Sequence, residues 1–163
     1  MTSCTGDTDR AAPIPPRTAD EDSLVGLRIT DPPLAASLAR LGHPDPAAAV
    51  EALDDGGGAV RLESPVAQAA LTLNQADDDS WWLYSAMYRR PTAERPLEVP
   101  LPYGFSLYED RQATRDRLGP PARTAIMPVD VWLFGKVEAY VLFDHVGPAK
   151  FIQFSHVDGE RLI

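Results

Sequence analysis

The three histidines are the first side chains to consider for chemistry, because imidazole is a common general base and metal ligand at neutral pH. His43 follows an expected helix, His145 lies in an expected hairpin turn, and His156 stands near the end of an expected strand. Their spacing matches no His-Glu-x-x-His or similar zinc-binding pattern. Asp144 and His145 are adjacent, which would suit a base or a metal ligand, although turns commonly carry such pairs in solvent. We therefore expect no catalytic residue, no metal and no cofactor, and an enzyme that uses Asp144 and His145 is the least favoured hypothesis.

Other catalytic and ligand-binding motifs are absent from the sequence. The glycine-rich run DDGGGAV at residues 54–60 lacks both phosphate-binding glycine patterns, and its aspartates would repel phosphate. The chain has no Gly-x-Ser-x-Gly motif of a serine hydrolase. Its single cysteine, Cys4, excludes an intramolecular disulfide framework and fits a reducing compartment. The first residues lack the apolar segment of a signal peptide. We therefore expect a cytoplasmic protein that binds rather than catalyses.

The charge of the chain predicts a basic partner. Its 163 residues carry a formal net charge of -9, which disfavours nucleic acid and anionic membranes. Acidic residues cluster in two expected turns, and one cluster directly precedes two tryptophans. Successive side chains of a strand point to opposite faces, so we expect one tryptophan in the core and the other exposed as an anchor; the alternative is that both rings are buried. The predicted partner-binding residues are Asp54, Asp55, Asp77, Asp78, Asp79, Trp81 and Trp82.

The first half of the chain predicts two helices followed by three strands. Residues 1–22 have the composition of a disordered or loosely attached tail. A helix is expected over residues 31–42, with Asp31 as its N-cap and Gly42 after its last turn, and a second over 45–53. Alternating apolar residues or strand-favouring aromatics then mark strands at 59–64, 69–75 and 80–90, separated by turn signals. Short turns between consecutive strands indicate an antiparallel meander.

The second half follows the same order. A helix is expected over residues 110–118, ended by Gly119 and two prolines, and strands are expected at 130–135, 138–144 and 149–157. We therefore predict one α+β domain over residues 23–163, with an antiparallel sheet built from two degenerate helix–three-strand repeats and helices packed on one face. Its halves are residues 23–90 and 97–163, joined by a proline-rich connector at 91–100. The expected core includes Trp132, Phe143, Ile152 and Phe154.

The segment LPYGFSLYEDRQATRDRLGPPAR, residues 101–123, with the three strands after it, resembles a unit found in small bacterial α+β proteins. It is similar to the helix–meander unit of β-lactamase-inhibitor-like and outer-membrane-assembly lipoprotein (SmpA/OmlA) domains. It is more similar to immunity proteins of bacterial polymorphic toxin and type VI secretion systems. The resemblance covers residues 97–158, with two departures: Thr114 stands where an apolar Val is usual, and Tyr108 where Gly is common. Its glycine and prolines end a helix, so the motif specifies a fold rather than an activity.

The resemblance implies a stoichiometric binding protein. The leading expectation is an immunity protein that binds a cognate toxin or effector and occludes its active or substrate-binding surface, with acidic clusters facing a basic toxin surface. The second is a non-catalytic envelope or inhibitor-type protein-binding domain. A signal sequence upstream of Cys4 would favour the second, and a neighbouring gene for a secreted toxin would favour the first.

Overall fold

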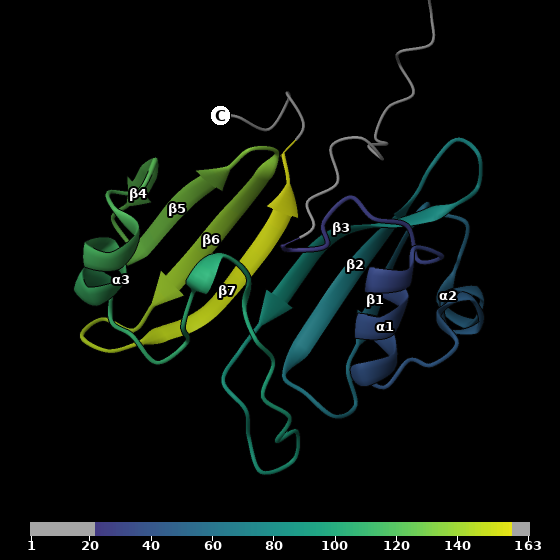
Figure 1. The fold of residues 1–163 in the computed structure, drawn as a ribbon, viewed down its shortest axis with the longest axis horizontal. Helices are drawn as coiled ribbons and strands as arrows, with labels where there is room; N and C mark the ends of the chain where they lie inside the picture. The colour runs from purple at the N-terminus through teal and green to yellow at the C-terminus, as the bar shows by residue number, and fades with distance from the viewer. Residues whose placement is uncertain (1–21, 158–163) are drawn as a thin grey trace, which may run out of the picture.

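The computed structural model describes residues 22–157, which form three α-helices and a seven-stranded antiparallel sheet. The predicted tail therefore lies outside the described residues, except for Asp22. In chain order the elements are α1 (Pro32–Arg40), α2 (Pro46–Leu53), β1 (Ala59–Glu63), β2 (Ala69–Gln75), β3 (Trp81–Tyr88), the 3-10 turn η3 (Pro102–Gly104), α3 (Arg111–Leu118), β4 (Arg123–Ala125), β5 (Val129–Phe134), β6 (Val137–Phe143) and β7 (Ala149–His156). The predicted α+β class is confirmed (Figure 1).

Two meanders meet in the middle of the sheet. The strand order is β1-β2-β3-β7-β6-β5-β4, so the last strand of each meander pairs with the last strand of the other. This junction is short, since only Ser85–Tyr88 of β3 pair with β7. The edge strand β4 was not predicted, because its three residues are too few to show an alternating pattern. From the β3–β7 pair outward, each meander runs back toward its own first strand, with three strands on one side and four on the other; the internal repeat itself stays a prediction.

The helices begin and end where their capping residues predict. Asp45 and Asp110 accept hydrogen bonds through their side chains from the backbone N–H groups of Ala48 and Ala113, at 3.2 and 2.8 Å. Asp31 precedes α1 but uses its carboxylate elsewhere, accepting from the Arg28 N–H at 2.8 Å. Gly42 has a φ of 96°, which lets the His43 N–H reach the Leu38 carbonyl at 2.8 Å and close the end of α1.

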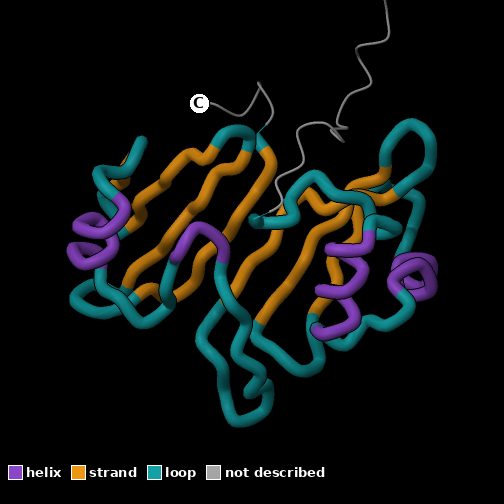
Figure 2. Tube along the Cα trace, viewed as in Figure 1, coloured by secondary structure: helices purple, strands orange, loops and turns teal. Residues whose placement is uncertain are grey.

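Helical segments lie over one face of the sheet (Figure 2), and the hydrophobic core fills the space between them and the strands. Leu34 and Leu38 of α1 are fully buried against the first meander. The segment around η3 covers the middle of the sheet, where Tyr103 stacks on Phe134 with ring centroids 4.0 Å apart. The four core residues predicted from the second half are confirmed as buried: Trp132, Phe143, Ile152 and Phe154.

An ion cluster beneath α3 holds this helix to the second meander. Asp130 of β5 is fully buried, and its carboxylate accepts hydrogen bonds from Arg111, Arg115 and Thr124. The shortest contacts from the two arginines are 2.7 Å. Burial alone would raise the pKa of Asp130, but these hydrogen bonds outweigh it and hold the pKa well below its usual range. Asp130 is therefore ionised at neutral pH.

The other face of the sheet carries no helix among residues 22–157. By the pairing registers, half-buried and exposed side chains of five strands point to this side. We call it the open face, represented by Arg61, Thr72, Met87, Tyr140, Phe151 and Gln153.

Candidate functional site

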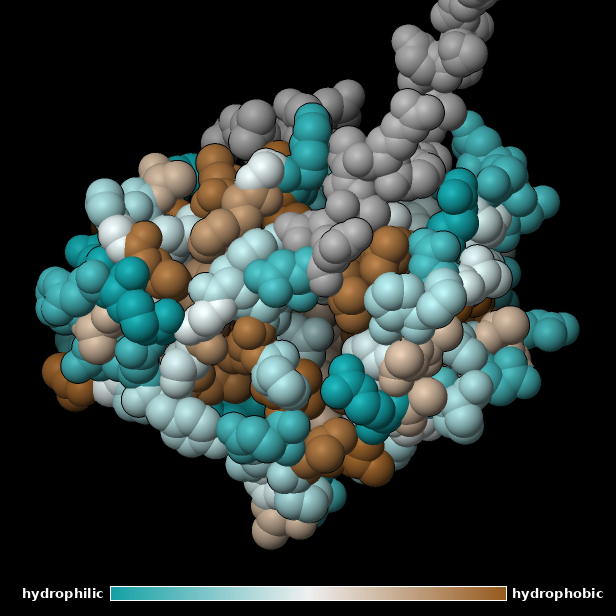
Figure 3. Space-filling view, in the orientation of Figure 1, coloured by the Kyte–Doolittle hydropathy of each residue, from teal (hydrophilic) through white to brown (hydrophobic). Residues whose placement is uncertain are grey.

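The two acidic turns lie side by side at one end of the first meander. β1 begins just after the Asp54–Asp55 turn, β2 ends just before the Asp77–Asp79 turn, and the two strands are antiparallel neighbours. A hydrogen bond from the Gln75 N–H to the Gly58 carbonyl, at 2.9 Å, continues the ladder to this end. The end stands beside α2 at the upper right of Figure 1, and hydrophilic residues gather there in Figure 3. We call these five exposed aspartates the acidic end.

Local turns fix the carboxylates that follow α2. One oxygen of Asp54 accepts from the Gly56 N–H, and one oxygen of Asp55 accepts from the Gly57 N–H, both at 2.9 Å. Such Asx-type turns hold a side chain close to its own backbone. The loop therefore presents two neighbouring negative charges in a defined arrangement.

The second acidic turn is organised around Asp78. Its carboxylate accepts from the Ser80 hydroxyl at 2.5 Å and from the Ser80 N–H at 3.0 Å, and it lies 3.4 Å from the Arg28 guanidinium. The pKa of Asp78 is lowered, chiefly by the Ser80 side chain, then by the Ser80 N–H, and less by Arg28. Asp79 has a φ of 68°, which is a left-handed backbone conformation of the kind that tight turns use. Asp77 and Asp79 are exposed and pair with no cation of residues 22–157.

The expected exposed tryptophan is not found. Trp82 is 1% exposed, and its ring meets Tyr84 and His156 with centroids 5.8 and 5.4 Å away. Trp81 is half-buried against the core. Residues 24–29 run alongside the start of β3, with backbone hydrogen bonds to Trp81 and Leu83. The alternative, in which both rings are buried, holds fully for Trp82 and in part for Trp81, so neither ring is a fully exposed anchor at the acidic end.

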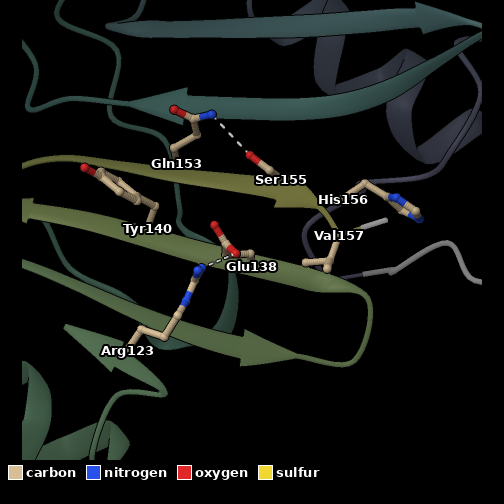
Figure 4. Close-up of a pocket in the computed structure, with 7 residues that line it drawn as sticks. All are labelled: Arg123, Glu138, Tyr140, Gln153, Ser155, His156 and Val157. Carbon is tan, nitrogen blue, oxygen red and sulfur yellow. Dashed lines mark hydrogen bonds and ion pairs between the residues drawn. The ribbon is translucent and has the colours of Figure 1, made fainter. Parts of the chain in front are cut away.

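A polar pocket lies on the open face of the second meander (Figure 4). Its volume is about 260 Å³. Arg123 and Glu138 form an ion pair at one side, and Gln153 donates to the Ser155 and Ser85 hydroxyls at 3.1 Å. The remaining lining residues are Tyr140, His156 and Val157. Sequence analysis missed this pocket, although the polar residues of β6 and β7 at every second position signalled a face without helical cover.

The side chains considered for catalysis are not assembled into a reactive group. Asp144 lies 3.6 Å from the Lys150 ammonium and 3.9 Å from the Arg90 guanidinium. The Nε2–H group of His43 donates a hydrogen bond to the Glu63 carbonyl at 2.9 Å. His43 and His145 are more than 100 residues apart in the sequence. Among the residues that the structure describes, no three histidine, cysteine or acidic side chains are grouped as metal ligands. The contacts of His43 and Asp144 are hydrogen bonds and ion pairs at the protein surface.

Comparisons of the chain with protein-family models, with curated proteins and with solved structures find no match. Within residues 22–157, none of the helices has the length and apolar character needed to cross a bilayer.

Proposed function

We propose that this chain is a cytoplasmic immunity protein, which binds a cognate bacterial toxin or effector and occludes its active or substrate-binding surface without catalysis. The observation that carries the proposal is the acidic end. Two clusters more than 20 residues apart in the sequence meet at one end of a sheet, where five carboxylates are exposed. A basic protein surface, such as that of a nuclease toxin delivered by type VI secretion, is the complementary partner.

Electrostatics supports a role in fast capture. Several like charges on a rigid turn create a local field that adds to the net charge of -9. Such a field steers an oppositely charged protein during encounter and raises the association rate constant more than it lowers the dissociation rate constant. Rapid capture is what protection against a toxin requires.

The open face supports the proposal by supplying contact area. A stable complex buries roughly 800 Å² on each partner, which is more than two turns provide. Tyr140 and Phe151 stack on this face with ring centroids 5.9 Å apart, and Arg89 lies over Phe151. Aromatic residues and arginine are the types enriched in protein interfaces.

A charge-neutral variant of the acidic end tests the proposal. Asp77→Asn with Asp79→Asn removes two unpaired carboxylates and leaves Asp78 to hold its turn. Asn accepts a positive φ at least as well as Asp, so the melting temperature is expected to stay within about 2 °C. We expect association with the cognate toxin to slow roughly threefold to tenfold at low ionic strength.

The matched control replaces two acids elsewhere, Glu109→Gln beside α3 with Asp116→Asn on it. It makes the same change in net charge, so it measures the effect of overall charge alone. Stopped-flow association at several salt concentrations should show a weaker salt dependence for the acidic-end variant than for the control. Equal rates for the two variants would show that the acidic end does not face the partner.

A further inference from the structure

A shallow pocket on the open face gathers three arginines at the end of the first meander that is opposite the acidic end. Its volume is about 130 Å³, and Arg61, Arg89 and Arg95 line it together with Glu63. Arg61 comes from β1, Arg89 directly follows β3, and Arg95 lies in the connector between the two halves. The start of β2 and Met87 complete the lining. We call this site the arginine pocket.

The arginine pocket has an excess of positive charge in an otherwise acidic protein. Glu63 forms an ion pair with Arg61, whose Nε lies 2.8 Å from the carboxylate. Arg89 faces the Phe151 ring, with 5.9 Å from its guanidinium carbon to the ring centroid, and is in no ion pair within residues 22–157. Arg95 is half-buried, and the described residues offer its guanidinium no carboxylate. Glu94 does not line the pocket. Two guanidinium groups therefore remain available for an anion.

The backbone around Arg95 is held in place. Thr92 and Arg95 close a turn through two hydrogen bonds of 3.1 Å, one between their backbones and one from the Arg95 N–H to the Thr92 hydroxyl. Gln68 donates to the same hydroxyl at 3.1 Å, and the Arg89 N–H donates to the Gln68 carbonyl at 2.9 Å. Gln68 thus ties together the segments that carry Arg89 and Arg95. A site whose backbone is fixed in advance loses less entropy when an anion binds.

We propose that the arginine pocket binds a carboxylate side chain from an acidic segment of a partner protein. The planar guanidinium group presents paired N–H donors that match a carboxylate, and one such donor, the Arg61 Nε–H, already binds the Glu63 carboxylate in the pocket. The site adjoins Met87 and the stacked Phe151–Tyr140 pair, an apolar and aromatic surface of the kind that proteins bury on association. That continuity favours a protein segment over a free small anion.

The identity of the partner rests on the proposed function, whereas the chemistry of the pocket does not. In the immunity complex, the toxin would place a basic region on the acidic end and a carboxylate in the arginine pocket. The two sites are separated by the length of β2, roughly 20 Å at about 3.3 Å per residue. This arrangement fixes the orientation of the bound partner, because a partner rotated end to end would bring like charges together.

A titration with a hexaglutamate peptide tests the pocket in the purified full chain, without the toxin. At low ionic strength, the Nε–Hε NMR signals of Arg89 and Arg95 should shift and saturate, although the protein as a whole repels the peptide. Arg89→Gln with Arg95→Gln should raise the Kd at least tenfold. The control Arg40→Gln with Lys136→Gln removes two exposed positive charges outside the pocket and should leave the Kd unchanged.

Three results would overturn the proposal. Equal peptide affinity for the pocket variant and the control would show that the arginines do not form the site. Displacement of the peptide by inorganic phosphate at equal charge concentration would identify a general anion site. A dimer of the wild-type chain in sedimentation that is lost in the pocket variant would identify the occupant as a second copy, whose acidic end fills the pocket. Because the assay contains no toxin, a failure of the immunity proposal leaves its outcome unaffected.

Discussion

The ion cluster around Asp130 permits the sharpest prediction about stability. Asp130→Asn keeps the size of the side chain but removes the charge that two arginines and Thr124 surround. Removing one partner of a buried ion pair costs about 3–5 kcal/mol, because the other charge is left without compensation. Arg111 and Arg115 are each about one-third exposed, at 31% and 32%, so water can partly solvate them after the change. We therefore expect a loss at the lower end of this range, about 3 kcal/mol.

Urea unfolding of wild type, Asp130→Asn and a control variant measures this loss. The control is Glu109→Gln, which also removes a carboxylate paired with an arginine of α3, but in the half-exposed Arg117–Glu109 pair. Surface pairs contribute about 0–1 kcal/mol. If Asp130→Asn destabilises the protein by no more than Glu109→Gln does, the cluster is not what holds α3 on the sheet.

The pH dependence of the difference in unfolding free energy between wild type and Asp130→Asn tests whether the ionised form of Asp130 is the stabilising one. The pKa of Asp130 in the folded protein lies below its unfolded value of about 3.9. The stabilisation is therefore fully present above about pH 4 and is lost as the pH falls through the folded pKa. The difference in unfolding free energy between wild type and Asp130→Asn should stay constant from pH 7 to about pH 5 and shrink below about pH 4. A difference that grows on acidification would contradict this account.

Two further changes test the packing. Trp132→Ala removes a 4% exposed ring and its 3.1 Å hydrogen bond to Gly119, so we expect a loss of roughly 3–5 kcal/mol; an unchanged thermal melt would refute its place in the core. Gly42→Ala puts a Cβ 2.5 Å from the Pro65 ring at a φ of 96° and should cost about 2–3 kcal/mol, against about 1 kcal/mol for Gly58→Ala, where φ is 82° and the space is open. Equal urea midpoints for the two glycine variants would show that the contact with Pro65 is unimportant.

Local signals were sufficient to predict most elements of the fold. Asp45, Asp110 and Gly119 mark helix ends through backbone hydrogen bonds that depend only on neighbouring residues. The pairing of β3 with β7 is different, because it joins segments more than 60 residues apart and leaves no periodic trace in either. The same is true of residues 24–29, whose backbone pairs with the start of β3.

The candidate site was predictable only in part. The aspartates were found because turns favour them and their clustering is visible in the sequence. That the two clusters adjoin follows from the β1–β2 register, which the predicted hairpin implied. The arginine pocket was not predictable, because Arg61, Arg89 and Arg95 come together only when the connector folds back against Gln68.

The central claim is that this chain binds and neutralises a toxin, and one measurement tests it most directly. The toxic domain of a candidate partner, sought first among secreted proteins encoded beside this gene, is expressed in cells with and without this chain, and the two purified proteins are titrated by calorimetry. We predict that cells survive only when this chain is present, and that the proteins form a saturable one-to-one complex whose association slows in the Asp77→Asn, Asp79→Asn variant. Cells that die equally with and without this chain, together with a titration that shows no binding, would contradict the claim.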